Sequence, residues 1–417
     1  MKVLWIVNTI FPDAAKRLGL EPPVYGGWMY GLAQQISSAN NIMLAVSTVY
    51  DGDELKIFDI QGIRYYLLPR YKKTGYSKEL EHHWKEITHE YRPNIVHIHG
   101  TEYLHGLACM RACSYLNYVV SIQGLLSCIS KYYYSDISYL EILKNITLRD
   151  VFRLDTIFHA KRKFDIQGKF EKEYFYRSNN VIGRTSWDYI HSKVKNHNIN
   201  YHFCNEVLRS GFYTAEKWDI ASKVDHTIFL SQATYPIKGL HQVLKAIGLL
   251  KDSFPNINLR IAGSSIVDDQ SIIQKLKLSG YGAFIKKLIQ KHNLECHVSF
   301  IGILSEKQMI EEYQRAHVFV CPSSIENSPN SLAEAQIIGV PCIASYVGGI
   351  PDMVVDDHSG FLYRFEEFEM MAHLIRRIFI DDNKAKSLSM EAIKCAQKRH
   401  NQLVNLNKIL EIYKKIV

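Results

Sequence analysis

The sequence predicts an α/β fold of two domains, each built on a doubly wound parallel sheet. Its strand candidates are short, continuous apolar runs, which are typical of strands buried on both faces. Helical segments alternate with these runs, as crossovers between parallel strands require. The series of strands starts again near residue 226, and 417 residues exceed what one hydrophobic core usually organises. The pattern therefore predicts two Rossmann-like domains.

The first half of the chain carries five strand candidates, each closed by glycine or a polar residue. They are residues 2–7, 41–48, 92–100, 118–124 and 179–185. A glycine pair, Gly26 and Gly27, opens a helical segment after the first candidate. The apolar run at the start is shorter than the apolar region of a leader and lacks a small-residue cleavage site, so we interpret it as the first strand.

The second half repeats this pattern with six more strand candidates. They are residues 226–233, 257–263, 297–302, 317–323, 340–345 and 359–363. We expect the first domain to span residues 1–205 and the second residues 206–400, with no low-complexity linker between them. The final helix, 401–417, has apolar residues at helical spacing and needs a packing partner, which we expect on the first domain.

The formal net charge of +8 lies mainly in the first half. Residues 1–205 carry 25 Lys and Arg against 19 Asp and Glu, or +6, and the rest carries 25 against 23, or +2. This excess suits an acidic substrate or an anionic membrane surface, and a mildly basic surface without a partner stays open. The sequence has no dense Lys/Arg–aromatic cluster, so nucleic acid is not an expected partner.

The eight cysteines include no C-x-x-C pair, and several lie in apolar runs. They predict buried, reduced thiols and not a disulfide or zinc framework. No stretch approaches the roughly 20 apolar residues of a membrane span. We therefore expect a cytoplasmic protein, and a peripheral position at the inner face of the membrane stays open.

Residues 141–177 mix Lys and Arg with Phe, Leu and Ile at roughly helical spacing. One interpretation is a surface that meets an anionic membrane. The other is a set of helices that cover the first sheet and keep their charged faces in water. We favour the second interpretation, because helices must cover a parallel sheet in any case.

Two glutamates, Glu326 and Glu334, stand eight residues apart in the stretch SSIENSPNSLAEAQIIGVPCIASYVGGIPDMV. Ser328 is the expected N-cap of a helix, Pro329 its first residue, and Asn330 and Ser331 lie in its first turn. Such a helix start offers free N–H groups and a partial positive charge to an anion. The two carboxylates can then reach different ends of one ligand with a central phosphate, such as a nucleotide-sugar.

This stretch resembles the signature of the retaining family 4 glycosyltransferases, of the group 1 glycosyl transferase type. The residues that match the order of the family are Pro322, Pro329, Asn330, Glu334, Ala335, Gly339, Pro341, Gly348 and Gly349. Segments elsewhere are also similar: the Gly26-Gly27 loop, IVHIHG, YPIKGLHQVLKAI and SFIGILSEKQMIEEYQRAHVFVCPS. The resemblance implies the GT-B architecture, in which two Rossmann-like domains face an interdomain cleft.

The resemblance also implies roles for single residues. Glu334 would bind the ribose hydroxyls of the donor, and Glu326 would contact the donor sugar. Lys238 would neutralise the diphosphate leaving group, where preorganised positive charge lowers the barrier. The remaining donor-site residues that it implies are Gly26, Gly27, Gly302, Ile303, Asn327, Ser328, Pro329, Asn330 and Ser331.

The sequence departs from the family at two places. Many relatives have a Gly-Arg pair before the Lys-Gly segment, whereas this chain has Gln232 and Ala233 there. We expect Gln232 and Arg184 among the donor-binding residues, and the hypothesis is that Arg184 or Arg209 supplies the missing charge. Gln123 stands where the family often has His, and glutamine still forms hydrogen bonds but cannot titrate. We expect Gln123 in the catalytic group with Glu326 and Lys238.

Together these features predict a metal-independent, retaining glycosyltransferase without a cofactor. It would move a hexose-type sugar from a nucleotide diphosphate sugar, such as a UDP- or GDP-sugar, to a hydroxyl group. The acceptor would be a glycan or a polyprenyl-linked intermediate of cell-surface polysaccharide assembly. Two alternatives stay open: a soluble, synthase-like enzyme acting on a sugar or sugar phosphate, and a catalytically silent nucleotide-sugar-binding protein.

His97 and His99 share one face of their strand, an arrangement that a metal site would also use. No third ligand is evident from the sequence, so we expect these histidines to be structural or to line the site.

Overall fold

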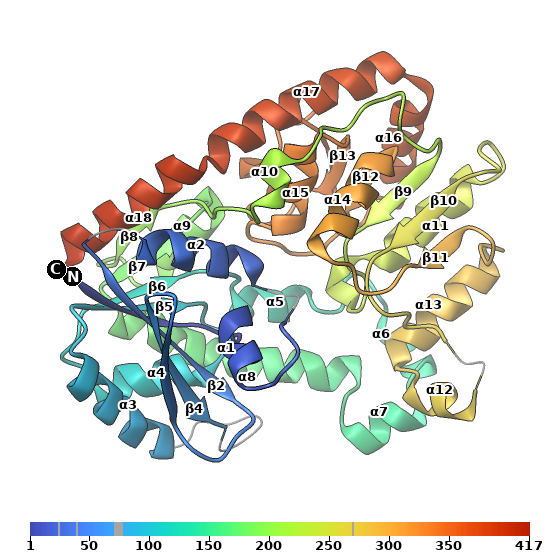
Figure 1. The fold of residues 1–417 in the computed structure, drawn as a ribbon. Coiled ribbons are helices and arrows are strands. Elements are labelled where there is room, and N and C mark those ends of the chain that lie inside the picture. The colour runs from blue at the N-terminus through green and yellow to red at the C-terminus, as the bar shows by residue number, and fades with distance from the viewer. Residues whose placement is uncertain (24–25, 39–40, 71–77, 269–270) are drawn as a thin grey trace. The chain divides into compact units, whose positions relative to one another are not determined.

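The computed structural model describes residues 1–23, 26–38, 41–70, 78–268 and 271–417 (Figure 1). The chain divides into two compact units. The first consists of Met1–Ser127, Ile166–Ser210 and His400–Val417, and the second of Cys128–Asp165 and Gly211–Arg399. Each unit is an α/β domain on a sheet of its own.

The sheet of the first unit has the strand order β3-β4-β2-β1-β5-β6-β7-β8. Its strands are β1 (Lys2–Ile6), β2 (Met43–Tyr50), β3 (Lys56–Ile60), β4 (Ile63–Pro69), β5 (Ile95–His99), β6 (Tyr118–Ser121), β7 (Asn180–Gly183) and β8 (Asn200–Phe203). All neighbours pair in parallel except β3, which is antiparallel to β4. The strand order reverses direction between β1 and β5, which makes this the switch point of the sheet.

The helices of the first unit include α18 (Gln402–Ile416), whose Tyr413 is fully buried. The Trp5 indole N–H donates a hydrogen bond to the Tyr413 hydroxyl at 2.8 Å, and His97 Nδ1 lies 2.6 Å from the same oxygen. The C-terminal helix is therefore part of the core of this unit. The others are α1 (Pro12–Arg17), α2 (Gly27–Ser37), α3 (Lys78–Tyr91), α4 (Leu104–Ala112) and α9 (Ser186–Lys195), while α5 (Leu126–Tyr132) and α8 (Ile157–Arg177) continue across the unit boundary.

The sheet of the second unit is parallel throughout, with the order β11-β10-β9-β12-β13-β14. Its strands are β9 (Thr227–Leu230), β10 (Asn258–Ile261), β11 (Val298–Phe300), β12 (Val318–Cys321), β13 (Cys342–Ser345) and β14 (Phe361–Tyr363). All four residues of β9 and of β12 are buried, which agrees with the apolar runs 228–230 and 318–321. The switch point of this sheet lies between β9 and β12.

The second unit surrounds its sheet with helices, two of them single 3-10 turns. They are α6 (Tyr139–Lys144), α7 (Leu148–Arg153), α10 (Gly211–Thr214), η1 (Pro236–Lys238), α11 (Leu240–Leu250), α12 (Ile272–Lys277), α13 (Gly280–Lys291), α14 (Glu306–Arg315), α15 (Asn330–Ile338), η2 (Ile350–Asp352), α16 (Phe368–Ile380) and α17 (Asp382–Arg399). A capping box of Ser305 and Gln308 begins α14, which contacts β9 and α15.

The expectation of two doubly wound sheets is confirmed, with differences in detail. All six strands predicted for the second half are present, whereas β3, β4 and β8 of the first unit were not predicted. Residues 128–165, which we assigned to the first domain, cluster with the second unit, and the other boundaries fall at Ser210 and Arg399. The preferred interpretation of residues 141–177 is wrong for α6 and α7, because these helices belong to the second unit, where they contact α13 and α12.

Membrane-spanning helices and the state of the cysteines can both be compared with the sequence expectations. Among the residues that the structure describes, no helix is long and apolar enough to cross a membrane. The eight cysteines are unbridged, and six are buried, but Cys296 is exposed and Cys395 is half-buried.

Candidate active site

The second unit gathers most of the predicted site residues at the carboxyl ends of β9 and β12. In doubly wound sheets ligands bind at the switch point, in the crevice outside these strand ends. The chain leaving β9 passes through Gln232 and reaches Lys238 at the end of η1. The chain leaving β12 passes through Glu326 and enters α15. The backbone N–H of Ser324 donates to the carbonyl of Ile237 at 2.8 Å, so the two loops are joined directly.

An ion pair connects these loops through their side chains. Lys238 Nζ lies 2.6 Å from Glu326 Oε1, and the Ser323 hydroxyl donates to the same oxygen at 2.8 Å. Burial lowers the pKa of the Lys238 ammonium, but the Glu326 carboxylate outweighs this effect, so the pKa lies above its ordinary value. Lys238 is therefore a fixed positive charge at the switch point.

A glycine holds the backbone of Glu326 in place. Gly348 has a φ of +52°, and a Cβ built on it would overlap the carbonyl oxygen of Glu326. The neighbouring N–H of Gly349 donates to that same carbonyl at 3.0 Å. The Gly348-Gly349 pair thus lies against the loop of Glu326, although it is 22 residues further along the chain.

The helix start after Glu326 lies one residue later than predicted. Pro329 is the N-cap of α15 and Asn330 its first residue, so the assignment of Ser328 as N-cap and Pro329 as first helical residue is wrong by one position. The side chain of the N-cap residue, Pro329, makes no capping hydrogen bond. The first-turn N–H groups of Asn330 and Ser331 point along the helix axis toward its start, which is the arrangement that attracts anions.

Glu334 lies inside α15, as expected from the sequence. Glu334 is buried one turn inside the helix, and the helix ends at Gly339, which has a φ of +98°. Asn327 is buried in the loop before the helix, while Ser328 is half-buried. The two carboxylates thus lie on either side of the helix start along the chain.

The remaining predicted residues of the second unit lie at the ends of neighbouring strands. Gln232 is exposed after β9, with its side-chain amide 3.4 Å from the Thr234 hydroxyl. Gly302 follows β11, and its carbonyl accepts a 2.7 Å hydrogen bond from the N–H of Gly263 after β10. Ile303 is exposed. These positions extend the same edge of the sheet toward β10 and β11.

The first unit holds Gly26, Gly27, Gln123, Arg184 and Arg209. Gly26 has a φ of +77° and is the N-cap of α2, and a Cβ on it would lie 2.8 Å from Thr9 Cγ2 in the loop after β1. A Cβ on Gly27 would lie 3.3 Å from Arg209 Cδ. Arg209 is half-buried and thus lies close to Gly27 in this loop. Gln123 is half-buried in the loop after β6.

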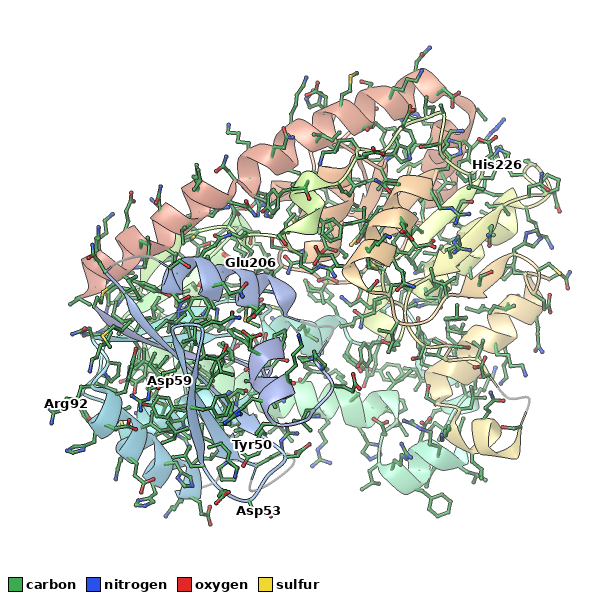
Figure 2. The ribbon with its side chains drawn as sticks, in the orientation of Figure 1. Tyr50, Asp53, Asp59, Arg92, Glu206 and His226 are labelled. Carbon is green, nitrogen blue, oxygen red and sulfur yellow. The ribbon has the colours of Figure 1, made fainter. Side chains whose placement is uncertain are left out.

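Arg184 has a different environment from the one we expected. Its side chain is buried, pairs with the buried carboxylate of Glu206 and lies over the Trp28 ring at 5.8 Å (Glu206 is labelled in Figure 2). Its charge is therefore balanced inside the first unit. This environment weighs against Arg184, and in favour of Arg209, as the substitute for the absent diphosphate-binding arginine.

The switch point of the first sheet contains a polar pair that sequence reasoning missed. Asn8 follows β1 and Glu102 follows β5, and the Asn8 amide donates to Glu102 Oε2 at 3.1 Å. Burial raises the pKa of Glu102 to about 7. Their positions just beyond two apolar strands were a usable signal, but no motif marks them.

The histidines considered for a metal have structural contacts. His97 bridges Tyr413 and Ser121 at 2.6 and 2.7 Å, and its ring lies 3.8 Å from that of His99. Burial lowers the pKa of both histidines, so they are neutral near pH 7. Among the described residues, His, Cys, Asp and Glu form no group of three that is placed to hold a metal ion.

Two doubly wound domains, the second with a lysine–glutamate pair and a helix start at its switch point, define the GT-B class of protein. Two solved structures of this architecture are similar over the whole chain and show the fold. Sucrose-phosphate synthase from Thermosynechococcus elongatus is 17% identical with a TM-score of 0.72, covering 100% of this chain and 99% of that one. Anabaena Alr3699/HepE in complex with UDP-glucose is 13% identical with a TM-score of 0.68, covering 100% of both chains.

Residues 214–395 match the family described as glycosyl transferases group 1. A curated relative, the uncharacterized glycosyltransferase YqgM of Bacillus subtilis, is 26% identical over 202 residues, which are 48% of this chain and 52% of YqgM. The chain spans about half or less of the length of the first curated relatives that it matches.

Proposed function

We propose that the protein is a retaining glycosyltransferase that uses a nucleotide diphosphate sugar. The Lys238–Glu326 pair before the start of α15 is the observation that carries this proposal. It puts a lysine ammonium, a carboxylate and a helix start at one switch point, and a sugar diphosphate needs these three groups. The likeness to a protein crystallised with UDP-glucose supports a UDP-sugar as the first donor to test.

In the reaction, the bond between the anomeric carbon of the sugar and a diphosphate oxygen breaks. A bond forms between that carbon and the acceptor oxygen, on the same face of the sugar, and the hydroxyl proton leaves with the diphosphate. Lys238 and the N–H groups at the start of α15 stabilise the charge that grows on the leaving diphosphate. Because these groups supply that charge from the protein, we propose that the reaction needs no divalent metal and no cofactor.

The two glutamates hold the donor and do not transfer protons. Glu334 accepts hydrogen bonds from the ribose hydroxyls, and Glu326 accepts one from a hydroxyl of the donor sugar while it keeps Lys238 in position. The backbone from Asn327 to Ser331 meets the sugar and the diphosphate. In the first unit, Gly26 and Gly27 allow the backbone to approach the phosphates, and Gln123 provides a hydrogen bond to the sugar.

For the acceptor, we propose a glycan or a polyprenyl-linked intermediate in cell-surface polysaccharide assembly, used at the inner face of the membrane. The +6 charge of residues 1–205 supports an acidic acceptor of this kind. The second candidate is transfer to a free sugar phosphate, which the likeness to sucrose-phosphate synthase favours. Turnover of a water-soluble sugar phosphate but not of a lipid-linked glycan would select the second candidate.

A thermal-shift series with UDP, GDP and their sugar conjugates tests the proposal. A ligand that binds only the folded protein raises its stability by about 2.7 kcal/mol at a hundredfold excess over Kd. We expect one nucleotide series to stabilise the protein. Glu334→Ala should weaken the binding of that nucleotide about tenfold, and the affinity of Glu334→Gln should lie between those of the wild type and Glu334→Ala. No response to any nucleoside diphosphate would reject the proposal, and full affinity in both variants would remove the ribose assignment.

A further inference from the structure

Two short helices of the second unit expose an unusual number of large apolar side chains. Phe152 is 85% exposed and Leu148 is 72% exposed. We call this region the α6–α7 surface, and its exposed apolar residues are Leu140, Leu143, Leu148, Val151, Phe152 and Leu154. Single exposed apolar residues are ordinary, but six within 15 residues form a patch that marks a contact surface.

The opposite faces of the two helices are fixed to the second unit. The buried carboxylate of Asp150 accepts a 2.7 Å hydrogen bond from the N–H of Gly280, at the first residue of α13. The Thr147 hydroxyl donates to the carbonyl of Leu278 at 2.9 Å. In Figure 1, α6 and α7 accordingly lie next to α13 and α12. The exposed side chains therefore belong to a well-anchored element.

Helical spacing separates the anchoring face from the exposed one. Leu148 and Phe152 stand two residues to either side of Asp150 in the sequence, so they lie on the face of α7 opposite to that anchor. In α6, Leu140 and Lys144 stand two residues before and after the buried Ile142, so they lie on the helix face opposite to it. Both helices thus turn an apolar face away from the unit, with Lys144 and Arg153 exposed at their C-terminal ends.

The charge around this surface is positive. Residues 139–165 contain six Lys and Arg against four acidic residues. Asp150 and Asp155 both pair with Arg149, and Asp165 pairs with Lys161. Outside these pairs the segment has Lys144, Arg153, Arg162 and Lys163 against Glu141. The neighbouring residues 276–291, in α12 and α13, add four lysines and no acid.

We propose that the α6–α7 surface docks the protein on a bilayer that contains anionic lipids. Exposed Leu, Val and Phe side chains enter the interface between headgroups and acyl chains, and each basic residue nearby adds about 1 kcal/mol of attraction. A second copy of the same surface is a poor occupant, because two positively charged patches repel each other. Docking would bring the second unit to a lipid-linked acceptor. This role of the α6–α7 surface rests on the proposed function.

Co-sedimentation of the full chain with vesicles tests this docking. Vesicles of phosphatidylcholine alone are compared with vesicles that contain phosphatidylglycerol as about a third of the lipid. We expect binding to the anionic vesicles, weaker binding at high salt, and a loss of about tenfold or more in Leu148→Ser/Phe152→Ser. Arg162→Ser/Lys163→Ser, at two exposed positions of α8, should reduce binding to anionic vesicles only.

Val194→Ser is the matched control, because Val194 is 80% exposed but lies in α9 of the first unit. It should bind vesicles like the wild type. Equal binding of the wild type and Leu148→Ser/Phe152→Ser, or no binding of the wild type to anionic vesicles, would overturn the proposal. A self-association that the same double variant abolishes, with vesicle binding unchanged, would also overturn it and identify a second copy as the occupant.

The response to nucleotides in vesicle-free buffer separates this inference from the proposed function. All of these variants should keep the thermal shift of the wild type, because their substitutions lie at exposed positions outside the donor site. A thermal shift without vesicle binding would reject the docking surface alone. Vesicle binding without any thermal shift would reject the proposed function and leave the docking surface supported.

Discussion

Lys238 Nζ and Glu326 Oε1 lie 2.6 Å apart, although 88 residues separate them in the sequence. They face each other because β9 and β12 are neighbours in the sheet, so the loops that follow these strands meet. The pair is partly shielded from water, with exposed side-chain fractions of 24% and 16%. A preformed lysine of this kind needs little reorganisation when a diphosphate leaves.

The first prediction concerns this pair. Lys238→Met should lower kcat/KM by about a hundredfold to a thousandfold, as the loss of one preorganised transition-state donor does. Glu326→Gln should lower it less, because the amide still reaches Ser323 and the sugar while Lys238 loses its anchor. Initial rates of nucleotide release measure both effects, with stability followed by urea unfolding.

Lys307→Met is the control for this experiment, since Lys307 lies in α14 with a side chain that is 88% exposed. It should leave the rate within about twofold of the wild type. If Lys238→Met also kept that rate while remaining folded, Lys238 would have no role at the leaving group.

The second prediction separates the two arginines that were candidates for the missing diphosphate contact. Arg209→Ala should lower the rate and change stability little, because Arg209 is half-buried beside Gly27. Arg184→Ala should instead lower the free energy of unfolding by about 3–5 kcal/mol, because it leaves the buried Glu206 carboxylate without its ion-pair partner.

Comparing the two variants by urea unfolding and by single-turnover rates decides between these roles. Arg184→Met/Glu206→Leu should recover part of the stability lost in Arg184→Ala, since no charge is then left buried. A rate loss in Arg184→Ala without a loss of stability, together with an unchanged rate in Arg209→Ala, would reverse the assignment.

Burial explains why β9 and β12 were predicted and β3 and β8 were not, although the unpredicted β4 is mostly buried and the predicted β11 is half-buried throughout. The continuous apolar runs of β9 and β12 are buried on both faces, and such runs are easy to recognise. The edge strand β3 alternates between half-buried and exposed positions, and β8 has no fully buried residue, so neither presents an apolar run. Gln61 and Gly62, with φ values of +49° and +78°, form the two-residue turn between β3 and β4, a hairpin signal that was available in the sequence.

In the candidate site, features within one segment were predictable from the sequence, whereas contacts between distant segments were not. The spacing of Glu326 and Glu334 can be read along one loop and one helix, because the two residues are close in the chain. The contacts of Glu326 with Lys238 and with Gly348-Gly349 depend on which strands become neighbours, and local sequence patterns do not contain this information. The burial of Arg184 against Glu206 likewise depends on tertiary packing.

The third prediction tests whether Gly348 positions Glu326. Gly348→Ala should reduce activity strongly and lower stability by several kcal/mol, because its Cβ overlaps the carbonyl of Glu326 and its φ is positive. Gly62→Ala has a positive φ but an open environment, and should cost only roughly 1–2 kcal/mol with normal activity. Equal behaviour of the two variants in unfolding and rate measurements would show that the close approach at Gly348 has no consequence.

The fourth prediction concerns Glu102, whose pKa burial raises to about 7 from an ordinary value of 4.5. Between these two pH values the folded protein keeps a proton on Glu102 that the unfolded chain has released. The free energy of unfolding therefore decreases as pH rises through this range, by up to about 3 kcal/mol in total, and the loss is complete above pH 7. Glu102→Gln cannot ionise, so it should be more stable than the wild type at pH 8 and similar to it at pH 4.5.

Urea unfolding between pH 4.5 and 8 measures this difference. The buried His97, His99 and His105 have lowered pKa values, so they add an opposite slope at acidic pH, but they do so equally in both proteins. The difference between the wild type and Glu102→Gln thus isolates the carboxyl group. Glu21→Gln, at an exposed position, should follow the wild type throughout. A pH-independent difference between the wild type and Glu102→Gln would mean that Glu102 is ionised in the folded protein at pH 5–7, and the polar pair at the first switch point would then be a charged one.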